Sequence, residues 1–329
     1  MPLSSSSIYS VRSLTEAINA LPSTPTLLRE LGIFKNQPLT TTYIRVGVRD
    51  YELALIDAVP RGASGAGVNY QYQNIGNFDC LHLPAHERVL ADDVQNMEAF
   101  GSNSKAQAVA ELVNDKLAVM KQAIEYTREH LMLGALKGKI LNADGSEIVD
   151  IYSRFGLTRR SENLSFQDKD IITVGLEALK RAGRAQRKGE TVTGWAMLCA
   201  PDFFDALIGH KSVRDVYLRY QEAAQYHKGF DGQFETAGIK FFVYDYEFPS
   251  GNKVEAGKAI MFPLGTMGTF REYFAPANMN ETVNTRALPF YASKEKLDHG
   301  KGWDLEAQSN PLPLVLRPNL VCDVEMQTA

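Results

Sequence analysis

The fold is decided by the stretch L-K-G-K-I-L-N-A-D-G-S-E-I-V-D-I-Y-S-R-F, Leu136 to Phe155, read together with the chain end N-T-R-A-L-P-F-Y-A-S-K-E-K-L-D-H-G-K-G-W-D-L-E-A-Q-S-N-P-L-P-L-V-L-R-P-N-L-V-C-D-V-E-M, Asn284 to Met326. Within the first stretch, Ile140 to Tyr152 is typical of a β-hairpin whose turn is N-A-D-G. The second predicts strands, turns and a chain end tied into a sheet. Neither stretch holds a credible catalytic set, so both indicate a shape-making role.

A long helix is predicted immediately before the hairpin, from Asn103 to Lys137. No proline interrupts it, and apolar residues recur near helical spacing. We expect four of them to form the core of this helix: Val113, Leu117, Met120 and Ile124. At about 1.5 Å per residue the helix would be roughly 50 Å long, which suits a structural spine better than an enzyme.

The N-terminal residues 1–42 indicate an arm with two short helices. The first would begin at the capping-box pair Ser13 and Glu16. The second would have Thr24 as its N-cap and Pro25 at its first position. Helices this short are not stable alone, so they need a surface to pack on, such as a neighbouring subunit.

A strand is predicted from Thr42 to Val48, and the residues after it, Asp50 to Glu87, show no helical period. This stretch is rich in glycine and predicts a long hairpin reaching away from the body, covered by a partner. The segment R-G-A-S-G-A-G lacks the G-K-[ST] of a phosphate-binding loop and favours a turn. The turn residues are Arg61, Gly62, Gly65 and Gly67.

Helix and strand patterns alternate from Asp168 onward and predict a second, α/β lobe. Its helices are expected at 172–189, 201–208 and 212–224, and its strands at 191–199, 239–246 and 258–262. The chain would then return to the first lobe and end there as strands at 312–316 and 320–324.

Composition narrows the function class. The chain has 329 residues, 44% hydrophobic and 22% charged, with a net charge of −4. Dedicated nucleic-acid-binding domains are usually strongly basic, so this balance argues against one, although a protein can enclose DNA without it. The three cysteines form no C-x-x-C pair and indicate reduced, packed thiols. The N-terminus lacks signal-peptide features and no apolar run could span a membrane, so we expect a soluble, cytoplasmically made protein.

Candidate chemistry is weak. His82 and His86 have the spacing of two metal ligands on a helix, but Pro84 between them argues against a helix. A basic helix end could touch DNA phosphates, but cations are also favourable at any helix C-terminus. Its residues are Lys180, Arg181, Arg184, Arg187 and Lys188. No Ser/His/Asp or Cys/His set is evident, so no catalytic, cofactor or metal residues are predicted.

Several segments, in order along the chain, resemble one family. They are T-P-T-L-L-R-E-L-G-I-F (24–34), V-P-R-G-A-S-G (59–65), E-H-L-M-L-G-A-L-K-G-K-I-L-N-A-D-G (129–145), G-T-F-R-E-Y-F-A-P-A-N (268–278), N-T-R-A-L-P-F-Y-A (284–292) and Q-S-N-P-L-P-L-V-L-R-P (308–318). Together they are similar to the lambda-type major capsid protein family of tailed phages, capsid protein E.

The resemblance implies the α+β shell fold of tailed-phage and herpesvirus capsids, the Hong Kong ninety-seven fold. Its parts would be an N-terminal arm (1–42), an extended loop (43–90), a peripheral domain with the spine helix (91–160 and 291–329) and an axial domain (161–290). The implied function is that of a major head protein. It would assemble with itself into hexamers and pentamers of an icosahedral shell that encloses double-stranded DNA without sequence-specific binding.

The same resemblance implies a virion protein assembled in the host cytoplasm, away from membranes, with scaffolding, decoration and portal proteins as separate partners. Two alternatives stay open at this point. One is an encapsulin-like bacterial shell of the same fold that holds an enzyme cargo. The other is an α/β hydrolytic enzyme, which a well-formed pocket with perturbed titratable groups would favour.

Overall fold

The structure is a computed structural model that describes residues 10–49, 72–93, 105–167, 171–214 and 233–327. Contacts within the chain divide it into two compact units. The first unit comprises Met1–Ile44, Asn77–Leu131 and Arg271–Pro313, and the second comprises Arg45–Gly76, Met132–Phe270 and Leu314–Ala329. Helices and strands mix within each unit, so the predicted α+β class is confirmed.

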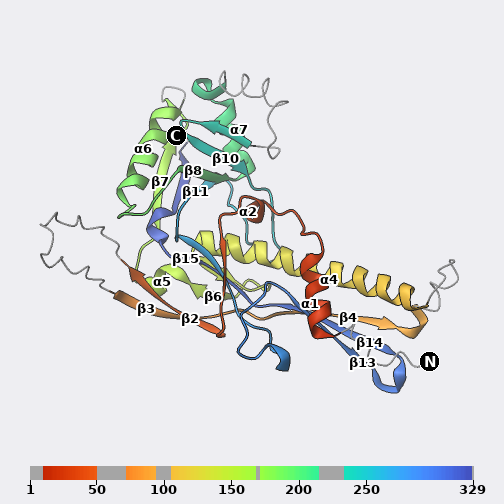
Figure 1. Cartoon of the computed structure of the whole chain (residues 1–329). Coiled ribbons are helices and arrows are strands. Elements are labelled where there is room, and N and C mark those ends of the chain that lie inside the picture. The colour runs from red at the N-terminus through yellow and green to blue at the C-terminus, as the bar shows by residue number, and fades with distance from the viewer. Residues whose placement is uncertain (1–9, 50–71, 94–104, 168–170, 215–232, 328–329) are drawn as a thin grey trace, which may run out of the picture. The chain divides into compact units, whose positions relative to one another are not determined.

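The longest element is helix α4, Lys105–Lys137, which Figure 1 shows as one continuous helix, as the sequence predicted. It has no proline, and its apolar residues recur at helical spacing. The buried ones in the first unit include Val109, Val113, Leu117, Met120 and Ile124. The helix stops where Gly138 adopts a φ of +84°, a conformation that glycine takes without strain.

A three-stranded antiparallel sheet of the first unit packs in the same core as α4. Its order is β13 (Tyr291–Lys296), β14 (Gly302–Ser309) and β4 (Leu83–Leu90). Leu305, Ala307 and Val89 join the α4 side chains in one hydrophobic cluster. The hairpin that the sequence predicted to reach away from the body, residues 50–87, included most of β4. The pairing of β4 along the whole of β14 ties this part into the three-stranded sheet instead.

The two N-terminal helices pack on the chain itself. Helix α1, Val11–Ala20, begins at Ser10, whose hydroxyl accepts a hydrogen bond from Ser13 N at 3.2 Å. The helix therefore starts before the predicted capping box. Its residues Leu14 and Ile18 enter the α4 core, so no neighbouring subunit is needed to hold it.

Helix α2 is a single turn, Leu27–Glu30, whose N-cap is Thr26 rather than the predicted Thr24. Strand β1, Lys35–Pro38, follows and runs parallel to β12, Phe270–Phe274, in a sheet of order β1-β12-β15. Strand β15 spans Pro311–Val315. Three short 3₁₀ turns lie in this C-terminal part: η2 (Asn280–Thr282), η3 (Asp298–Gly300) and η4 (Pro318–Leu320).

The second unit contains a six-stranded sheet of order β7-β16-β11-β8-β10-β9. The strands are β7 (Arg160–Ser165), β16 (Cys322–Gln327), β11 (Lys258–Leu264), β8 (Gly194–Cys199), β10 (Ile239–Val243) and β9 (Gln233–Thr236). Helices α6 (Ile172–Ala185) and α7 (Pro201–Gly209) belong to the same unit. Helix α6 ends before the predicted Gly189, and most of the helix predicted at 212–224 lies outside the described residues.

The last strand differs from the sequence-based expectation. Instead of returning to the first lobe, β16 lies between β7 and β11 in the six-stranded sheet. Arg159, next to β7, forms a two-pronged ion pair with Asp323 of β16 and donates to Leu136 O at 2.8 Å. The strand pattern of 320–324 was recognisable, but alternation along a strand does not say which strand it will join.

The predicted hairpin after α4 is confirmed as β5 (Lys139–Leu141) and β6 (Glu147–Asp150), with Gly145 in its turn at a φ of +84°. Residues Ile151–Phe155 continue as the short helix α5 rather than as strand. Strands β2 (Tyr43–Arg49) and β3 (Tyr72–Asp79) form a separate two-stranded ribbon.

Candidate functional site

The histidines with metal-ligand spacing lie on strand β4 and in the turn before it, not on a helix. The Nδ1 of His82 lies 2.8 Å from Asn310 Oδ1, and His86 is exposed to solvent. In the described parts of the chain no cluster of three or more His, Cys, Asp or Glu side chains could hold a metal ion. The same parts contain no helix long and apolar enough to cross a membrane.

The three cysteines are free thiols, of which Cys199 and Cys322 are buried and Cys80 is half-buried. Burial and the nearby Asp79 raise the pKa of Cys80 to about 12, and burial is also the main reason why the pKa of Cys322 rises to about 11. Burial raises the pKa of Cys199 well above its ordinary value. Because the thiolate is the nucleophile, these raised pKa values make the thiols weak nucleophiles at neutral pH.

A serine and a histidine do meet in the second unit, but in a structural role. The Nδ1 of His210 lies 2.9 Å from Ser212 Oγ, which also accepts a hydrogen bond from Ile172 N at 3.3 Å. The Nε2 of His210 lies 3.2 Å from the carbonyl oxygen of Gln167. No described carboxylate orients this histidine, so the pair anchors the start of α6 and does not complete a triad.

The sequence predicted two groups of site residues, an assembly-loop turn and the core of the long helix. The loop-turn residues Arg61, Gly62, Gly65 and Gly67 lie outside the described residues. The helix residues Val113, Leu117, Met120 and Ile124 are all buried, at no more than 3% exposure. They line the inner side of α4 in the first unit.

Helix α4 carries a row of buried charged residues that the sequence pattern did not indicate. Lys121, Glu125 and Glu129 lie four residues apart, and all three are buried. The ammonium group of Lys121 donates to the carbonyl oxygens of Ile18 at 2.9 Å and Leu21 at 2.6 Å. These carbonyls belong to the C-terminal turn of α1, whose last carbonyls have no partner within the helix. Lys121 therefore caps α1 from the side.

The two glutamates of the row hold the chain between α1 and α2. Glu125 accepts a hydrogen bond from Thr24 N at 2.6 Å and pairs with Arg29. Glu129 accepts one from Leu28 N at 2.9 Å. Burial raises the pKa of Glu125, but the hydrogen bonds from Arg29 and Thr24 outweigh this effect and hold the pKa below its usual value. Charges at this spacing are normally a solvated helix face, so nothing in the sequence marked them as buried.

A second buried ion pair joins α4 to β12. Arg128 donates to both carboxylate oxygens of Glu272, at 2.8 and 2.6 Å. Its guanidinium group lies 4.9 Å from the ring centre of Phe274 and 5.3 Å from that of Phe290. Removing one partner of such a pair leaves an uncompensated buried charge, so the pair is a strong constraint on how this helix packs.

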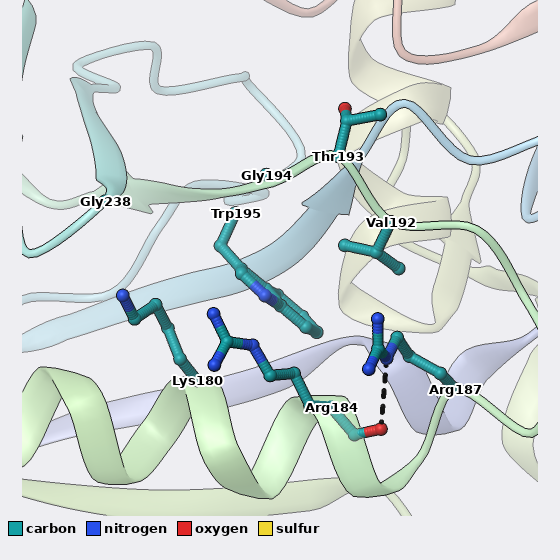
Figure 2. Close-up of a pocket in the computed structure, with 8 residues that line it drawn as sticks. All are labelled: Lys180, Arg184, Arg187, Val192, Thr193, Gly194, Trp195 and Gly238. Atoms are coloured by element: carbon teal, nitrogen blue, oxygen red, sulfur yellow. Dashed lines mark hydrogen bonds between the residues drawn. The ribbon is translucent and has the colours of Figure 1, made fainter.

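The second unit carries a basic pocket of about 170 Å³ between α6 and β8, shown in Figure 2. Its lining residues are Lys180, Arg184, Arg187, Val192, Thr193, Gly194, Trp195 and Gly238. A Cβ at Gly183 would lie 2.5 Å from the Trp195 ring, so this glycine is what lets the indole lie against the helix. The sequence predicted the basic helix end but not the pocket, because the strand that closes it comes from a later segment.

The comparisons with known proteins agree with the family resemblance. The family model described as Phage major capsid protein E matches residues 10–326. The major capsid protein of Salmonella phage Felix O1 is 25% identical, with 98% of this chain and 97% of the relative covered. The major capsid protein of Pseudomonas phage KPP10 is 26% identical, with 94% of each covered.

Solved structures agree on the fold. The proposed capsid protein of an E. coli CFT073 prophage matches with a TM-score of 0.58 at 13% identity, covering 97% of this chain and 99% of that one. A phage-related protein of Bordetella bronchiseptica RB50 matches with a TM-score of 0.53 at 11% identity, covering 96% and 97%. The fold is therefore the Hong Kong ninety-seven shell fold. Since the family model spans both units, from the first described residue to the last strand, this chain belongs to the phage major capsid protein E family, is a component of the virion that forms the phage head shell, and is not an enzyme.

Proposed function

We propose that the chain assembles with identical copies into hexamers and pentamers, and that these close into an icosahedral head enclosing double-stranded DNA. The observation that supports this is the family match over residues 10–326, which includes most of the arm, the long helix and the described sheets. Identical subunits that make heterologous contacts form rings when the rotation between them closes. Scaffolding, decoration and portal proteins are separate partners in this proposal.

The proposed division of the chain has four parts: the arm (1–42), the extended loop (43–90), the peripheral domain (91–160 and 291–329) and the axial domain (161–290). The ribbon of β2 and β3 is consistent with this proposal for the extended loop. A sheet of two strands is marginally stable in water, so we expect a neighbouring subunit to stabilise it. Strand β4 supplies the base of this loop, because it is paired with β14. Strand β16 lies in the range 291–329 of the peripheral domain but pairs with β11 of the axial range, so we assign this strand to the axial sheet.

Within the extended loop we propose that Arg61, Gly62, Gly65 and Gly67 form a turn at the contact between neighbouring subunits. Glycines permit backbone angles that other residues avoid, which suits a tight turn pressed against another chain. The predicted helix-core residues act within their own subunit, by packing α4 into its hydrophobic core. They are Val113, Leu117, Met120 and Ile124.

The proposal is tested by expressing the full chain and examining the purified protein by negative-stain electron microscopy and light scattering. We expect closed shells, or rings with the mass of pentamers and hexamers. A protein that stays monomeric at high concentration, also when co-expressed with a scaffolding protein, contradicts the proposal. Shells that form only around a co-purified enzyme would favour the cargo-holding bacterial shell instead.

A further inference from the structure

The basic pocket holds more positive charge than its own neighbours neutralise. Lys180 is 6% exposed, lies 2.7 Å from Glu177 and also donates to the carbonyl oxygen of Ala237. It therefore has a carboxylate partner and ties the turn between β9 and β10 to α6. These contacts account for the charge of Lys180 but not for the charges of the two other cations that line the pocket, Arg184 and Arg187.

The two arginines of the pocket have no such partner among the residues that the structure describes. Among the described residues, no carboxylate lies within ion-pair distance of Arg184 or Arg187. Arg187 donates from its Nε to the carbonyl oxygen of Arg184 at 3.3 Å, and its other guanidinium N–H groups make no side-chain hydrogen bond to the part of the chain that the structure describes. Figure 2 shows Lys180 and Arg184 of α6, and Arg187 from the segment just after it, pointing toward the segment that carries Trp195.

Glu190, the acidic residue nearest to Arg187 in the sequence, does not line the pocket. Glu190 lies 3.3 Å from the guanidinium of Arg317 and accepts hydrogen bonds from Met267 N at 3.0 Å and Thr269 Oγ1 at 3.2 Å. Its charge and its lone pairs are thus used outside the pocket. Counted over the described residues, three cations and one carboxylate, Glu177, give the pocket a net positive charge.

Stabilisation of the helix dipole accounts for only part of this arrangement. Cations in the last turn of a helix are favourable, which fits Arg184, and Arg187, just beyond the end, donates to the Arg184 carbonyl oxygen of that last turn. Stabilisation of the dipole does not explain why a cavity lies beside these cations, or why the Trp195 ring packs against Gly183. It also does not require a buried lysine a full turn before the end of the helix.

We propose that this pocket binds a backbone phosphate of the enclosed double-stranded DNA, an inference that rests on the proposed function. Guanidinium groups bind phosphate oxygens through paired hydrogen bonds, and an ammonium group adds a point charge. A phosphate group offers acceptor oxygens in several directions, which suits three cationic groups around one space. A single carboxylate offers one planar edge that one guanidinium can satisfy. A cavity of about 170 Å³ admits such a group but no base pair, so the contact is independent of sequence.

The test measures DNA affinity of full-length protein kept as subunits or capsomers before assembly. Fluorescence anisotropy follows two labelled duplexes of unrelated sequence at one fixed salt concentration. The pocket variant is R184Q/R187Q. The matched control is R181Q/K188Q, which removes the same charge from the same helix end but does not line the pocket. Arg184→Lys removes the guanidinium fork and keeps the charge.

The pocket variant should lose about tenfold in affinity for both duplexes, because charge-assisted hydrogen bonds to phosphate are lost. The control should stay close to the unmodified protein, and Arg184→Lys should fall between. Inorganic phosphate added at matched ionic strength should compete for the unmodified protein and not for the pocket variant. Equal losses in the pocket variant and the control would overturn the proposal in favour of diffuse charge.

Binding of a glutamate-rich peptide that depends on the pocket, together with unchanged DNA affinity, would also overturn it and assign the pocket to an acidic protein segment. Circular dichroism checks the fold of each variant. If the double variant does not fold, the single change at the exposed Arg184, Arg184→Gln, carries the same test. Electron microscopy of shells is scored separately. If shells form and the pocket variant binds DNA as tightly as the unmodified protein, only this inference is contradicted. If no shells form, the proposed function is contradicted.

Discussion

At the scale of single residues, helix α4 places two kinds of side chain in the first unit. Leu117 is fully buried and Met120 nearly so, as their helical spacing indicates. Lys121 and Glu125 are buried as well, although their type indicates the opposite. The difference is that the charged groups find hydrogen-bond partners in the chain around α1 and α2, which compensates for the loss of water.

The first prediction concerns Leu117. Its side chain is fully buried in the core shared by α1, α4 and the three-stranded sheet. Leu117→Ala should lower the free energy of unfolding of the unassembled subunit by about 2–5 kcal/mol, because the cavity closes only partly. Chemical denaturation measures this. Val119→Ala, at a position that is 60% exposed, is the control and should change stability by less than about 0.5 kcal/mol. Similar losses in both variants would contradict the packing of α4 seen here.

The second prediction concerns Glu125 and pH. Burial raises the pKa of its carboxyl, yet hydrogen bonds from Arg29 and Thr24 N hold that pKa below its usual 4.5. The folded protein therefore binds this proton more weakly than the unfolded chain does. The carboxylate thus stabilises the fold fully above pH 4.5, and this contribution is lost as the pH falls through the lower, folded value.

The check is the free energy of unfolding measured from about pH 6 down to about pH 3. The unmodified protein should lose stability on acidification more steeply than Glu125→Gln, which should already be less stable near neutral pH. Val119→Ala changes no charge and should follow the slope of the unmodified protein. Parallel curves for Glu125→Gln and the unmodified protein would show that this carboxylate does not titrate with folding.

At the scale of elements, helix α1 packs within the subunit, because Leu14 and Ile18 lie in the α4 core. We expect the ribbon of β2 and β3 to gain further stability from a neighbouring subunit, since among the described residues its two strands pair with each other alone. The third prediction uses this difference.

The turn residue Gly62, in the segment between β2 and β3, is predicted to act in assembly. Gly62→Val should reduce shell formation, seen by light scattering and electron microscopy, while the melting temperature of the unassembled subunit changes little. Valine strongly disfavours the backbone angles that such a turn needs. Leu117→Ala is the contrasting control, because it should lower the melting temperature directly. Equal loss of assembly and of subunit stability in Gly62→Val would point to a role within the subunit.

At the scale of the whole molecule, one helix contributes to both compact units. Residues of α4 up to Leu131 belong to the first unit, and those from Met132 belong to the second. Buried residues occur on both sides of this boundary, for example Ile124 in the first unit and Leu133 in the second. A shared helix couples the two units, because unfolding one of them removes support from the part packed in the other.

The fourth prediction follows from this coupling. Scanning calorimetry of the unassembled subunit should show one cooperative transition rather than two. Leu117→Ala, which lies in the first unit, should shift the whole transition to lower temperature. Two resolved transitions, with only one of them moved by Leu117→Ala, would show that the units unfold independently despite the helix that they share.

The sequence by itself determined the elements whose signals are local. The spacing of apolar residues defined α4, the N-A-D-G turn defined the hairpin of β5 and β6, and Pro201 marked the start of α7. Motifs in order along the chain were enough to indicate the capsid family, because a family resemblance needs residue order and no contacts.

Only the tertiary structure decided which distant segments meet. The sequence identified the last strand but not its place beside β11, and it identified the cations after Leu179 but not the pocket that Trp195 closes. It also gave no sign that Glu125 would be buried. The physical reason is the same in each case. Local spacing decides which face of an element is apolar, whereas strand partners, cavities and the burial of charge depend on groups supplied by segments far away in the chain.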